Sequence, residues 1–351
     1  MNRFKRHAAM FGVVSMMASV LVIAAPTNVA QAAGPPVAEL PTDNPANWTP
    51  NVIDGQVNSI WQFGDKVVIG GTFTQIADSD INGGAVHDQP YLAAFDATSG
   101  VVDAGFDPVL NDGVEVVIPG TDANTLFIGG DFNTVDGVNR RKVAKLNVAD
   151  GSLVEAFDIN GMNGRVRDLR LVDNTLYAAG LFTRVGLEDR ELLVSVDATS
   201  GDVTTDLDLD FAGLHSGGVG KVIKIETTPD AGRMLITGNF TSIDGVVRDQ
   251  VALIDLSTSP ATVSDWQTDW YAADCASVFD SYTRDLDISA DGTYAIIVTT
   301  GAYRAGRSCD TVSRLELDDE TAGVTPTWVS YTGGDTSYSV EIHDGVAYIG
   351  G

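Results

Sequence analysis

The sequence predicts an all-β protein in which a small antiparallel sheet is repeated along the chain. A strand with a glycine and a phenylalanine recurs about every 50 to 60 residues, and an internal period of this size is typical of stacked repeats. Alternating apolar runs and Asp/Asn/Gly turns surround each copy, and no long helical periodicity competes with them. Glycine accounts for 37 of the 351 residues, which fits a chain with many tight turns.

Residues 1–32 have the pattern of a secretory signal peptide. A basic start at 3–6 precedes an uncharged apolar run at 8–25, and Ala30-Gln31-Ala32 supplies a small-x-small cleavage pattern, so we place the cut after Ala32. The alternative is an uncleaved membrane anchor, since about 18 apolar residues could just span a bilayer. No later apolar stretch is that long, and we expect no membrane span after cleavage.

Residues 33–50 contain five prolines and predict an extended N-terminal arm ahead of the repeats at 51–351. The chain carries 21 Lys and Arg residues against 48 Asp and Glu residues, which gives a net charge of −27. Nucleic-acid partners are therefore not expected, because phosphate contacts need a basic surface. An anionic membrane surface would repel the chain as well.

The repeated strand is clearest at 68–74, 127–133, 178–183 and 236–241, and a weaker copy lies at 300–303. Glycine in a strand interior is favoured where another backbone must approach closely. We expect the phenylalanine two residues later to fill the core between neighbouring sheets, where a buried ring is worth about 1.5–3 kcal/mol. The predicted structural residues of the repeat are Gly71, Phe73, Gly130, Phe132, Gly180, Phe182, Gly238 and Phe240.

Each repeat has four predicted strands in the same order. An alternating first strand, as at 222–226, precedes the glycine-phenylalanine strand. A longer loop leads to a third strand, as at 251–255, and a short fourth strand, as at 266–270, ends the unit. One such sheet cannot bury both of its faces, whereas sheets stacked around an axis can. The predicted fold class is therefore a β-propeller of four-stranded antiparallel blades, five nearly complete and a sixth partial.

The Gly-Gly-x-Phe-Thr-x-x-x-Gly pattern resembles the delta-60-type repeat of bacterial β-propellers, which is Kelch-like in appearance. It is also similar to the propeller repeats of the yeast bud-site cortical markers. The resemblance covers residues of about 50–351, and the fourth and fifth units look like those of secreted actinobacterial proteins. It implies an extracellular, often multidomain protein with no defined activity. Ala179 before Gly180 and Tyr303 in place of a phenylalanine depart from the pattern.

The sequence stops inside the second strand of a sixth repeat, while residues 47–50 resemble the fourth strand of a blade. We therefore expect a truncated form of a longer protein in which the arm supplies the outer strand of the closing blade.

Cys275 and Cys309 are the only cysteines, and an even count in a secreted protein suggests a disulfide. Cys275 lies in the connection between two units, and Cys309 follows the second strand of the later unit. Both connections emerge on the same face of a propeller, so we expect the two residues to be joined. The alternative is a pair of free thiols.

The segment 78–83, Asp-Ser-Asp-Ile-Asn-Gly, resembles the first half of a calcium loop. Asp78, Asp80 and Asn82 would supply oxygen ligands, which suit Ca²⁺. The twelfth position is Gln89 instead of Glu, and the alternative is a polar loop insertion. Calcium is the one cofactor that the sequence suggests.

The segment 266–282 is the most aromatic irregular stretch, and it surrounds Cys275. Aromatic faces stack on sugars and dominate the energetics of interfaces. If the chain binds a ligand through its loops, we expect it here, on the face shared with Asp78 and His215; the alternative is local packing. The candidate ligand-binding residues are Trp270, Tyr271, Phe279, Tyr282 and His215.

Two functions fit these observations. The first is a secreted binding or scaffold module for an extracellular protein or glycan, because no unique acid, base or nucleophile cluster can be selected as catalytic. The second is a secreted carbohydrate-active enzyme (a hydrolase, lyase or sugar oxidoreductase) with its site at the channel mouth. Arg167-Asp168 and Arg284-Asp285 start two inner strands, where they form either ion pairs between blades or part of such a site.

Overall fold

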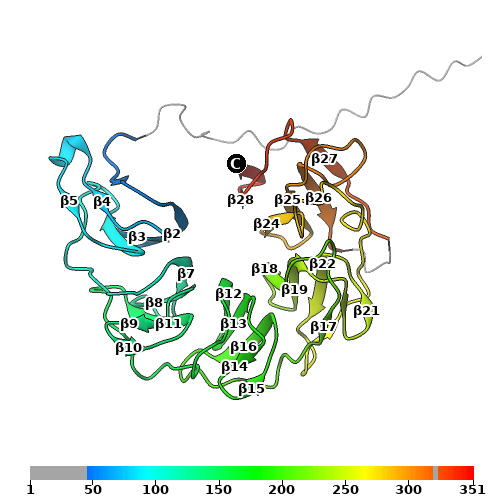
Figure 1. The fold of residues 1–351 in the computed structure, drawn as a ribbon, viewed down its shortest axis with the longest axis horizontal. Helices are drawn as coiled ribbons and strands as arrows, with labels where there is room; N and C mark the ends of the chain where they lie inside the picture. The colour runs from blue at the N-terminus through cyan, green and yellow to red at the C-terminus, as the bar shows by residue number, and fades with distance from the viewer. Residues whose placement is uncertain (1–45, 319–322) are drawn as a thin grey trace, which may run out of the picture. The chain divides into compact units, whose positions relative to one another are not determined.

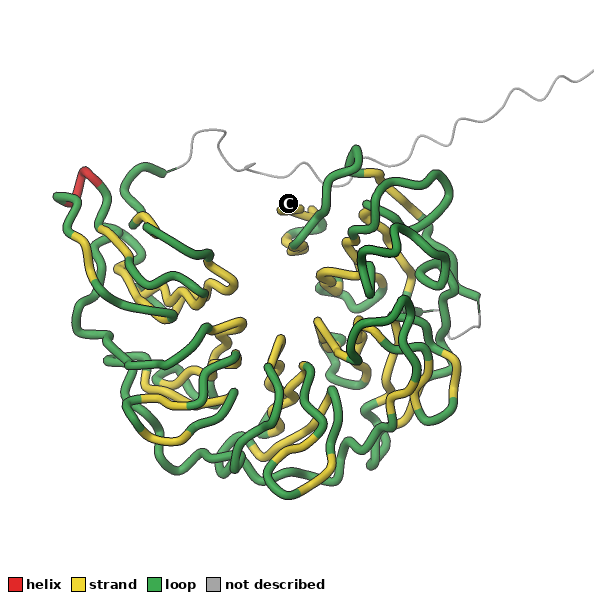
Figure 2. The backbone as a smooth tube through the Cα atoms, in the orientation of Figure 1, coloured by secondary structure: helices red, strands yellow, loops and turns green. Residues whose placement is uncertain are grey.

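The computed structural model describes residues 46–318 and 323–351, and these residues are almost entirely β-structure. The one helical turn among them is the 3₁₀ segment η1 (Asp80–Asn82), as the tube in Figure 2 shows. Six antiparallel main sheets follow one another along the chain, and we name them units 1 to 6. The prediction of an all-β chain built from repeated small sheets is confirmed.

The main sheets have these strands. Unit 1 contains β2 (Val57–Phe63), β3 (Lys66–Gly71) and β6 (Leu92–Asp96); unit 2 contains β7 (Val114–Pro119), β8 (Thr125–Gly130) and β11 (Val143–Asn147); unit 3 contains β12 (Val166–Val172), β13 (Thr175–Gly180) and β16 (Leu193–Asp197). Unit 4 contains β18 (Lys221–Thr227), β19 (Arg233–Asn239), β22 (Val251–Asp255) and β23 (Thr262–Val263); unit 5 contains β24 (Thr283–Ile288), β25 (Tyr294–Thr299), β26 (Thr311–Glu316) and β27 (Trp328–Tyr331); unit 6 contains β28 (Ser339–His343) and β29 (Val346–Gly350).

The prediction of four strands in every unit is too regular. Units 4 and 5 have a fourth strand, whereas in units 1 to 3 it is reduced to single bridges. These bridges pair Phe95 with Val102, Leu146 with Leu153, and Val196 with Val203. The chain turns away after one pair in these units, so the outer edge is shorter than the sequence pattern suggested.

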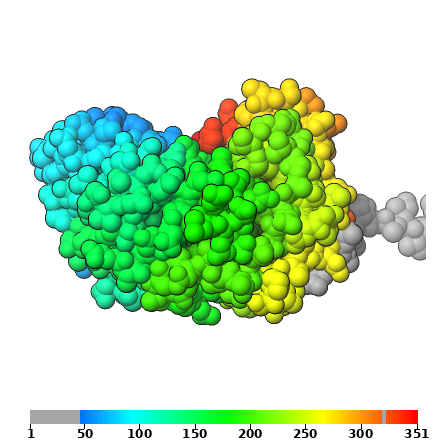
Figure 3. Space-filling view, turned by 60° about the horizontal axis from the view of Figure 1, so that its bottom comes forward, coloured from blue at the N-terminus to red at the C-terminus, as the bar shows by residue number. Residues whose placement is uncertain are grey.

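The first strands of the units surround a common centre, as Figure 1 shows for β2, β7, β12, β18, β24 and β28. Each of these inner strands contacts the inner strand of the next unit. In the space-filling view, units 2, 3 and 4 form a continuous surface from green to yellow (Figure 3). Neighbouring sheets therefore pack face to face, as expected for units that cannot bury both faces alone.

The repeat glycines lie where the second strand meets a bulge in the inner strand. Gly71, Gly130, Gly180 and Gly238 pair with the residue that begins each bulge. A Cβ on any of them would lie 2.0–2.3 Å from a backbone oxygen of the residue just before the bulge. The close approach of another backbone therefore favours glycine at these four positions.

The repeat phenylalanines lie in the hydrophobic core. Phe73, Phe132, Phe182 and Phe240 are fully buried. Phe182 illustrates the packing: its cluster joins Leu176 and Val194 of unit 3 to Phe127 of unit 2. The clusters of Phe132 and Phe240 likewise join two units, whereas Phe73 packs within unit 1. The general role of these rings between sheets stays a prediction.

The weak fifth copy of the repeat is placed differently from the prediction. Thr299 pairs with the first residue of β24 and so occupies the glycine position of unit 5. Gly301 lies beyond the strand at φ 137° and packs against Cys275. Tyr303 is 52% exposed and does not replace a core phenylalanine. The short sequence match at 300–303 is displaced by two residues from the structural repeat.

Small secondary sheets fasten the outer parts of units 1 to 4. In each, the loop between the second and third main strands, here called the return loop, forms a two-stranded hairpin. The hairpin meets the chain just before the inner strand, here called the entry segment. The hairpin strands are β4 (Ile76–Ala77) with β5 (Val86–His87), β9 (Thr134–Val135) with β10 (Val138–Asn139), β14 (Arg184–Val185) with β15 (Glu188–Asp189), and β20 (Ser242–Ile243) with β21 (Val246–Val247). The entry segments of units 1 and 4 contain β1 (Asn51–Val52) and β17 (Phe211–Ala212).

The predicted signal peptide and residues 33–45 of the arm lie outside the described residues. The end of the arm lies against unit 1, where a Cβ on Gly100 would lie 2.0 Å from the Trp48 backbone oxygen, and its role as an outer strand stays a prediction. Gly151 and Gly201 make the corresponding contacts with Pro108 and Asp158, each from the preceding unit. Among residues 46–318 and 323–351, no helix is long and apolar enough to cross a membrane.

Candidate functional site: a charged central cavity

The inner strands enclose a cavity of about 530 Å³ at the common centre. A second cavity of about 370 Å³ shares Trp61, Ile118, Arg170, Asp287 and Glu341 with it, so the two are continuous. All six units contribute lining residues. They come from 58–61, 116–118, 168–171, 224–227, 285–287 and 339–341, with 348–350 of β29.

In units 1 to 5 a bulge in the inner strand sets which side chains face the centre. Because side chains alternate along a strand, positions two residues apart line the same face. The first ring of equivalent positions is Ser59, Val116, Asp168, Lys224, Asp285 and Ser339. The second ring, two residues further on, is Trp61, Ile118, Arg170, Glu226, Asp287 and Glu341.

The first ring ties successive inner strands together. Asp168 Oδ2 accepts the N–H of Ile225 at 2.9 Å, and Asp285 Oδ2 accepts the N–H of Val340 at 2.9 Å. Lys224 lies between them, with Nζ 3.3 Å from Asp285 Oδ1 and 3.8 Å from Asp168 Oδ1. Burial disfavours the charge on Lys224, but the two carboxylates outweigh it and raise the pKa of the ammonium group.

The second ring contains three carboxylates and one guanidinium group. Arg170 is paired with Glu226. Asp287 accepts the N–H of Ile288 at 2.8 Å and that of Ile342 at 2.6 Å. Burial, with further contributions from the charges of Glu226 and Glu341, raises the pKa of Asp287 to about 6. Glu341 is exposed to the cavity and Trp61 is 42% exposed.

One polar atom of the first ring lacks a hydrogen-bond donor. The Asp168 side chain is 1% exposed, and its Oδ1 has no hydrogen-bond partner among the described residues. The nearest cation, Lys224, is 3.8 Å away. Since buried carboxylate oxygens are normally satisfied, this atom is available to a donor in the cavity.

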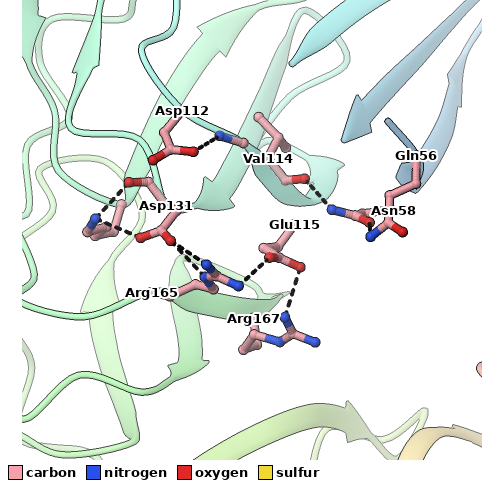
Figure 4. A network of polar contacts seen from close by, with 10 residues as sticks. Gln56, Asn58, Asp112, Val114, Glu115, Asp131, Arg165 and Arg167 are labelled. Carbon is pink, nitrogen blue, oxygen red and sulfur yellow. Dashed lines mark hydrogen bonds and ion pairs between the residues drawn. The ribbon is translucent and has the colours of Figure 1, made fainter. Parts of the chain in front are cut away.

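A second ion-pair network joins units 2 and 3 beside the first ring (Figure 4). Arg165 binds Asp131 and also contacts Glu115 at 3.3 Å, while Arg167 contacts the other oxygen of Glu115 at 3.2 Å. Arg167 and Asp168 therefore both pair with charged groups of neighbouring units. This outcome matches the expected ion pairs between blades.

The predicted aromatic loop is mostly core. Tyr271 and Tyr282 are fully buried, Trp270 packs on the core between units 4 and 5, and Phe279 lies under Arg284 with its centroid 5.7 Å from the guanidinium carbon. These positions favour the alternative of local packing, and ligand binding by these residues stays a prediction.

His215 lies next to this loop, as expected, but it is enclosed. Its side chain is 2% exposed, Nδ1 lies 2.8 Å from Asp249, and the ring packs edge-on against Tyr282. The structure joins Cys275 to Cys309, as predicted, directly under the same loop. The disulfide and the histidine both order this corner of the molecule.

In the candidate calcium loop, Asp78 uses both carboxylate oxygens within the protein. Asp78 Oδ1 accepts the N–H of Val102 at 2.8 Å, and Oδ2 lies 3.1 Å from His87 Nε2. Asn82 directs its amide nitrogen to the Ser99 backbone oxygen at 2.8 Å. Across 46–318 and 323–351, no three His, Cys, Asp or Glu side chains converge as metal ligands. The geometry favours a polar loop at Asp78, Asp80 and Asn82.

Sequence reasoning missed Trp61, Lys224, Glu226, Asp287 and Glu341. Each lies in an inner strand, where alternate residues look alike until the bulge is placed. The signal was nonetheless present, because the repeat glycine marks the bulge. In units 1 to 4, counting from the residue that pairs with this glycine identifies the ring positions, whereas in unit 5 Thr299 takes the place of the glycine and the signal is missing.

The comparisons with known proteins bear on the repeat. Residues 124–153, which run from the start of β8 beyond β11, match a family model described as a β-propeller domain of unknown function, DUF5122. The crystal structure of the computationally designed Ika8 protein is similar at 11% identity and a TM-score of 0.47, over 84% of this chain and 68% of that chain. No curated protein matches significantly. With radially arranged sheets on either side of the matched segment, the chain carries a β-propeller repeat.

Proposed function

We propose that the protein is a secreted, delta-60-type and Kelch-like β-propeller that acts as an extracellular binding module. The predicted signal peptide and the Cys275–Cys309 disulfide support an oxidising, extracellular location. The net charge of −27 disfavours nucleic acid as a partner. A protein or a glycan remains the expected class of partner.

The central cavity carries this proposal. It is lined by all six units, and most of its charged groups are held by fixed partners, such as Lys224 between Asp168 and Asp285. Such groups present a rigid pattern of charge, which suits recognition because little ordering is needed on binding. Trp61 adds an exposed aromatic face to the same cavity.

A glycan array and extracellular-protein screen on the full chain would test the role. We expect at least one ligand whose binding is lost in Trp61→Ala and kept in Trp328→Ala. Trp328 is a matched control, since it is 48% exposed and lies on the outer strand β27. Equal binding by the two variants to every ligand found would contradict a site in the cavity.

One observation favours the enzyme as a second candidate. The pKa of Asp287 is raised to about 6, beside the carboxylates Glu226 and Glu341, and a carboxyl group protonated near neutrality can act as a general acid. Against this role, both oxygens of Asp287 accept backbone N–H groups. Hydrolysis of chromogenic glycosides that is lost in Asp287→Asn and kept in Glu155→Gln would establish the enzyme.

A further inference from the structure

We propose that the central cavity binds an organic cation, an ammonium or guanidinium group, between the Trp61 indole and the carboxylates of the second ring. This inference rests on the proposed binding role and names its ligand class. It comes from the charge balance of the lining, from one buried carboxylate oxygen, and from the exposed indole.

Carboxylates outnumber basic groups in the lining of the two continuous cavities. The acidic residues are Asp168, Glu226, Asp285, Asp287 and Glu341, and the basic residues are Arg170 and Lys224. Both basic groups already pair with first- or second-ring carboxylates. The excess negative charge lies in a partly enclosed space, where opposite charges attract more strongly than in bulk water. A bound cation would relieve the repulsion around Asp287.

The unpartnered oxygen of Asp168 points to a donor. Its side chain is buried, it lines the larger cavity, and Oδ1 has no hydrogen-bond donor within the described part of the chain. Leaving a buried carboxylate oxygen unsatisfied is unfavourable. An ammonium or guanidinium group carries several N–H donors and can satisfy this atom while it balances the charge. A neutral sugar would satisfy the oxygen but leave the excess charge.

Trp61 supplies the aromatic partner of a cation. It lines both cavities and is 42% exposed, so its ring is accessible to a ligand. Cations bind tryptophan faces more strongly than the faces of other aromatic residues. Ile60 and Ile118 add apolar surface beside it, which suits the methylene groups of an alkylamine. A bare metal ion fits less well, because Asp285 and Asp287 use their oxygens on backbone N–H groups.

Calorimetric titration of the full chain would test the inference with two probes. Spermidine represents a free polyamine, and an N-acetylated trilysine peptide represents basic side chains of a protein partner. We expect micromolar to millimolar binding of at least one probe. Trp61→Ala should weaken it about tenfold, through loss of the cation–π contact. Glu341→Gln should weaken it about threefold, because Glu341 is exposed and screened.

The controls are Trp328→Ala and Glu155→Gln, which make the same chemical changes outside the cavity. Glu155 is exposed, and its side chain makes no hydrogen bond or ion pair among the described residues. Both controls should bind the probe like the parent chain. An equal loss in Glu155→Gln and Glu341→Gln would show general attraction to an acidic protein and overturn the inference.

The remaining outcomes separate the two proposals. Binding of spermidine alone identifies a free amine, and binding of the peptide identifies a protein partner; both support the inference. If neither probe binds but a neutral glycan binds and its binding depends on Trp61, the proposed cation ligand is wrong and the proposed binding role stands. If no ligand of any class depends on Trp61, both proposals fail.

Discussion

Units 1 to 4 and unit 5 differ in how the return loop is joined to the entry segment. In units 1 to 4 the return loop folds into a hairpin that meets the entry segment, for example where β4 pairs with β1 and where β20 pairs with β17. In unit 5 the entry segment contains Cys275, the return loop contains Cys309, and a disulfide joins them. The fifth unit thus replaces a hydrogen-bonded hairpin with one covalent bond.

Side chains strengthen the hairpin version in three units. Asp54, Asn111 and Asn163 each precede an inner strand and accept two backbone N–H groups from the return loop. The acceptor distances are 2.7–3.2 Å. The entry segment therefore cannot leave the sheet without breaking several bonds together. In unit 5 the buried ring of Tyr282 packs beside the disulfide.

The largest expected effect comes from removal of the covalent link. Replacing Cys275 and Cys309 together by Ser should destabilise the fold by about 3–4 kcal/mol, because the closed loop restricts the unfolded chain. The two residues are 34 positions apart in the sequence. Chemical denaturation of the oxidised parent and the double variant measures the loss.

Hydrogen exchange should locate that loss in unit 5. Amides of β24 and β25 are expected to lose protection, while those of β8 and β13 keep it, since each unit contacts only its neighbours. Uniform loss of protection across all units would contradict the comparison, because the disulfide would then stabilise the ring as a whole.

The next largest effect on stability is expected at the repeat glycine of unit 4, Gly238. Gly238→Ala should cost about 1–3 kcal/mol, because the added Cβ would lie 2.0 Å from the Lys221 backbone oxygen and the strands must separate. Gly220→Ala is the matched control, since its Cβ would meet Leu192 at an ordinary 3.5 Å. Thermal unfolding of the two variants measures the difference. Similar melting temperatures would show that the bulge does not require glycine.

A smaller effect is expected from the loss of the side-chain hydrogen bonds that join the entry segment of unit 3 to its return loop. Asn163→Ala removes the acceptor for the N–H groups of Thr183 and Arg184, which lie 2.9 and 3.0 Å from it. These bonds are exposed, so the loss should be about 1 kcal/mol. Faster amide exchange at Thr183 and Arg184, with little change in unit 5, would show that the Asn163 side chain holds the return loop to the entry segment. Unchanged exchange there would assign the fastening to the hairpin backbone alone.

The repeat could be predicted because backbone constraints fix its glycines. Gly71, Gly130, Gly180 and Gly238 all face the same bulge, and no other residue fits without a shift. The prediction failed in unit 5, where Thr299 occupies that register and its hydroxyl accepts the N–H of Thr311 at 2.9 Å. A local motif search then selected the next glycine, which packs on the disulfide for another reason.

The candidate site was harder to predict because a bulge reverses the faces of a strand. Before the bulge is placed, Asn58 and Ser59 are equally good candidates to face the centre. The aromatic side chains of 266–282 led to a wrong emphasis for another reason. In the sequence they resemble a ligand-binding surface, but most of them are buried, and some pack around the disulfide. Charge pairs at Asp168 and Asp285 were predictable because both begin inner strands.

The second ring extends the contrast between unit 5 and the earlier units. Arg170 of unit 3 and Asp287 of unit 5 occupy equivalent positions, but Arg170 is a cation among carboxylates, whereas Asp287 is itself acidic and faces two further carboxylates, Glu226 and Glu341. The folded state therefore holds a proton on Asp287 up to a pH of about 6, above the ordinary value of 3.8. Because the folded state binds this proton more tightly than the unfolded chain, stability falls as the pH rises from about 4 to about 6.

Glu341→Gln should lower the pKa of Asp287 and flatten that decline. The gain in stability at pH 7 should be about 0.5 kcal/mol, since Glu341 is exposed and water screens its charge, and it should vanish near pH 4. Carboxyl NMR titration of Asp287 and denaturation at pH 4 and 7 measure the two effects, with Glu155→Gln as the control. If the pKa of Asp287 is the same in Glu341→Gln as in the parent chain, burial alone raises it. The charge of Glu341 would then contribute nothing to the pH dependence of stability.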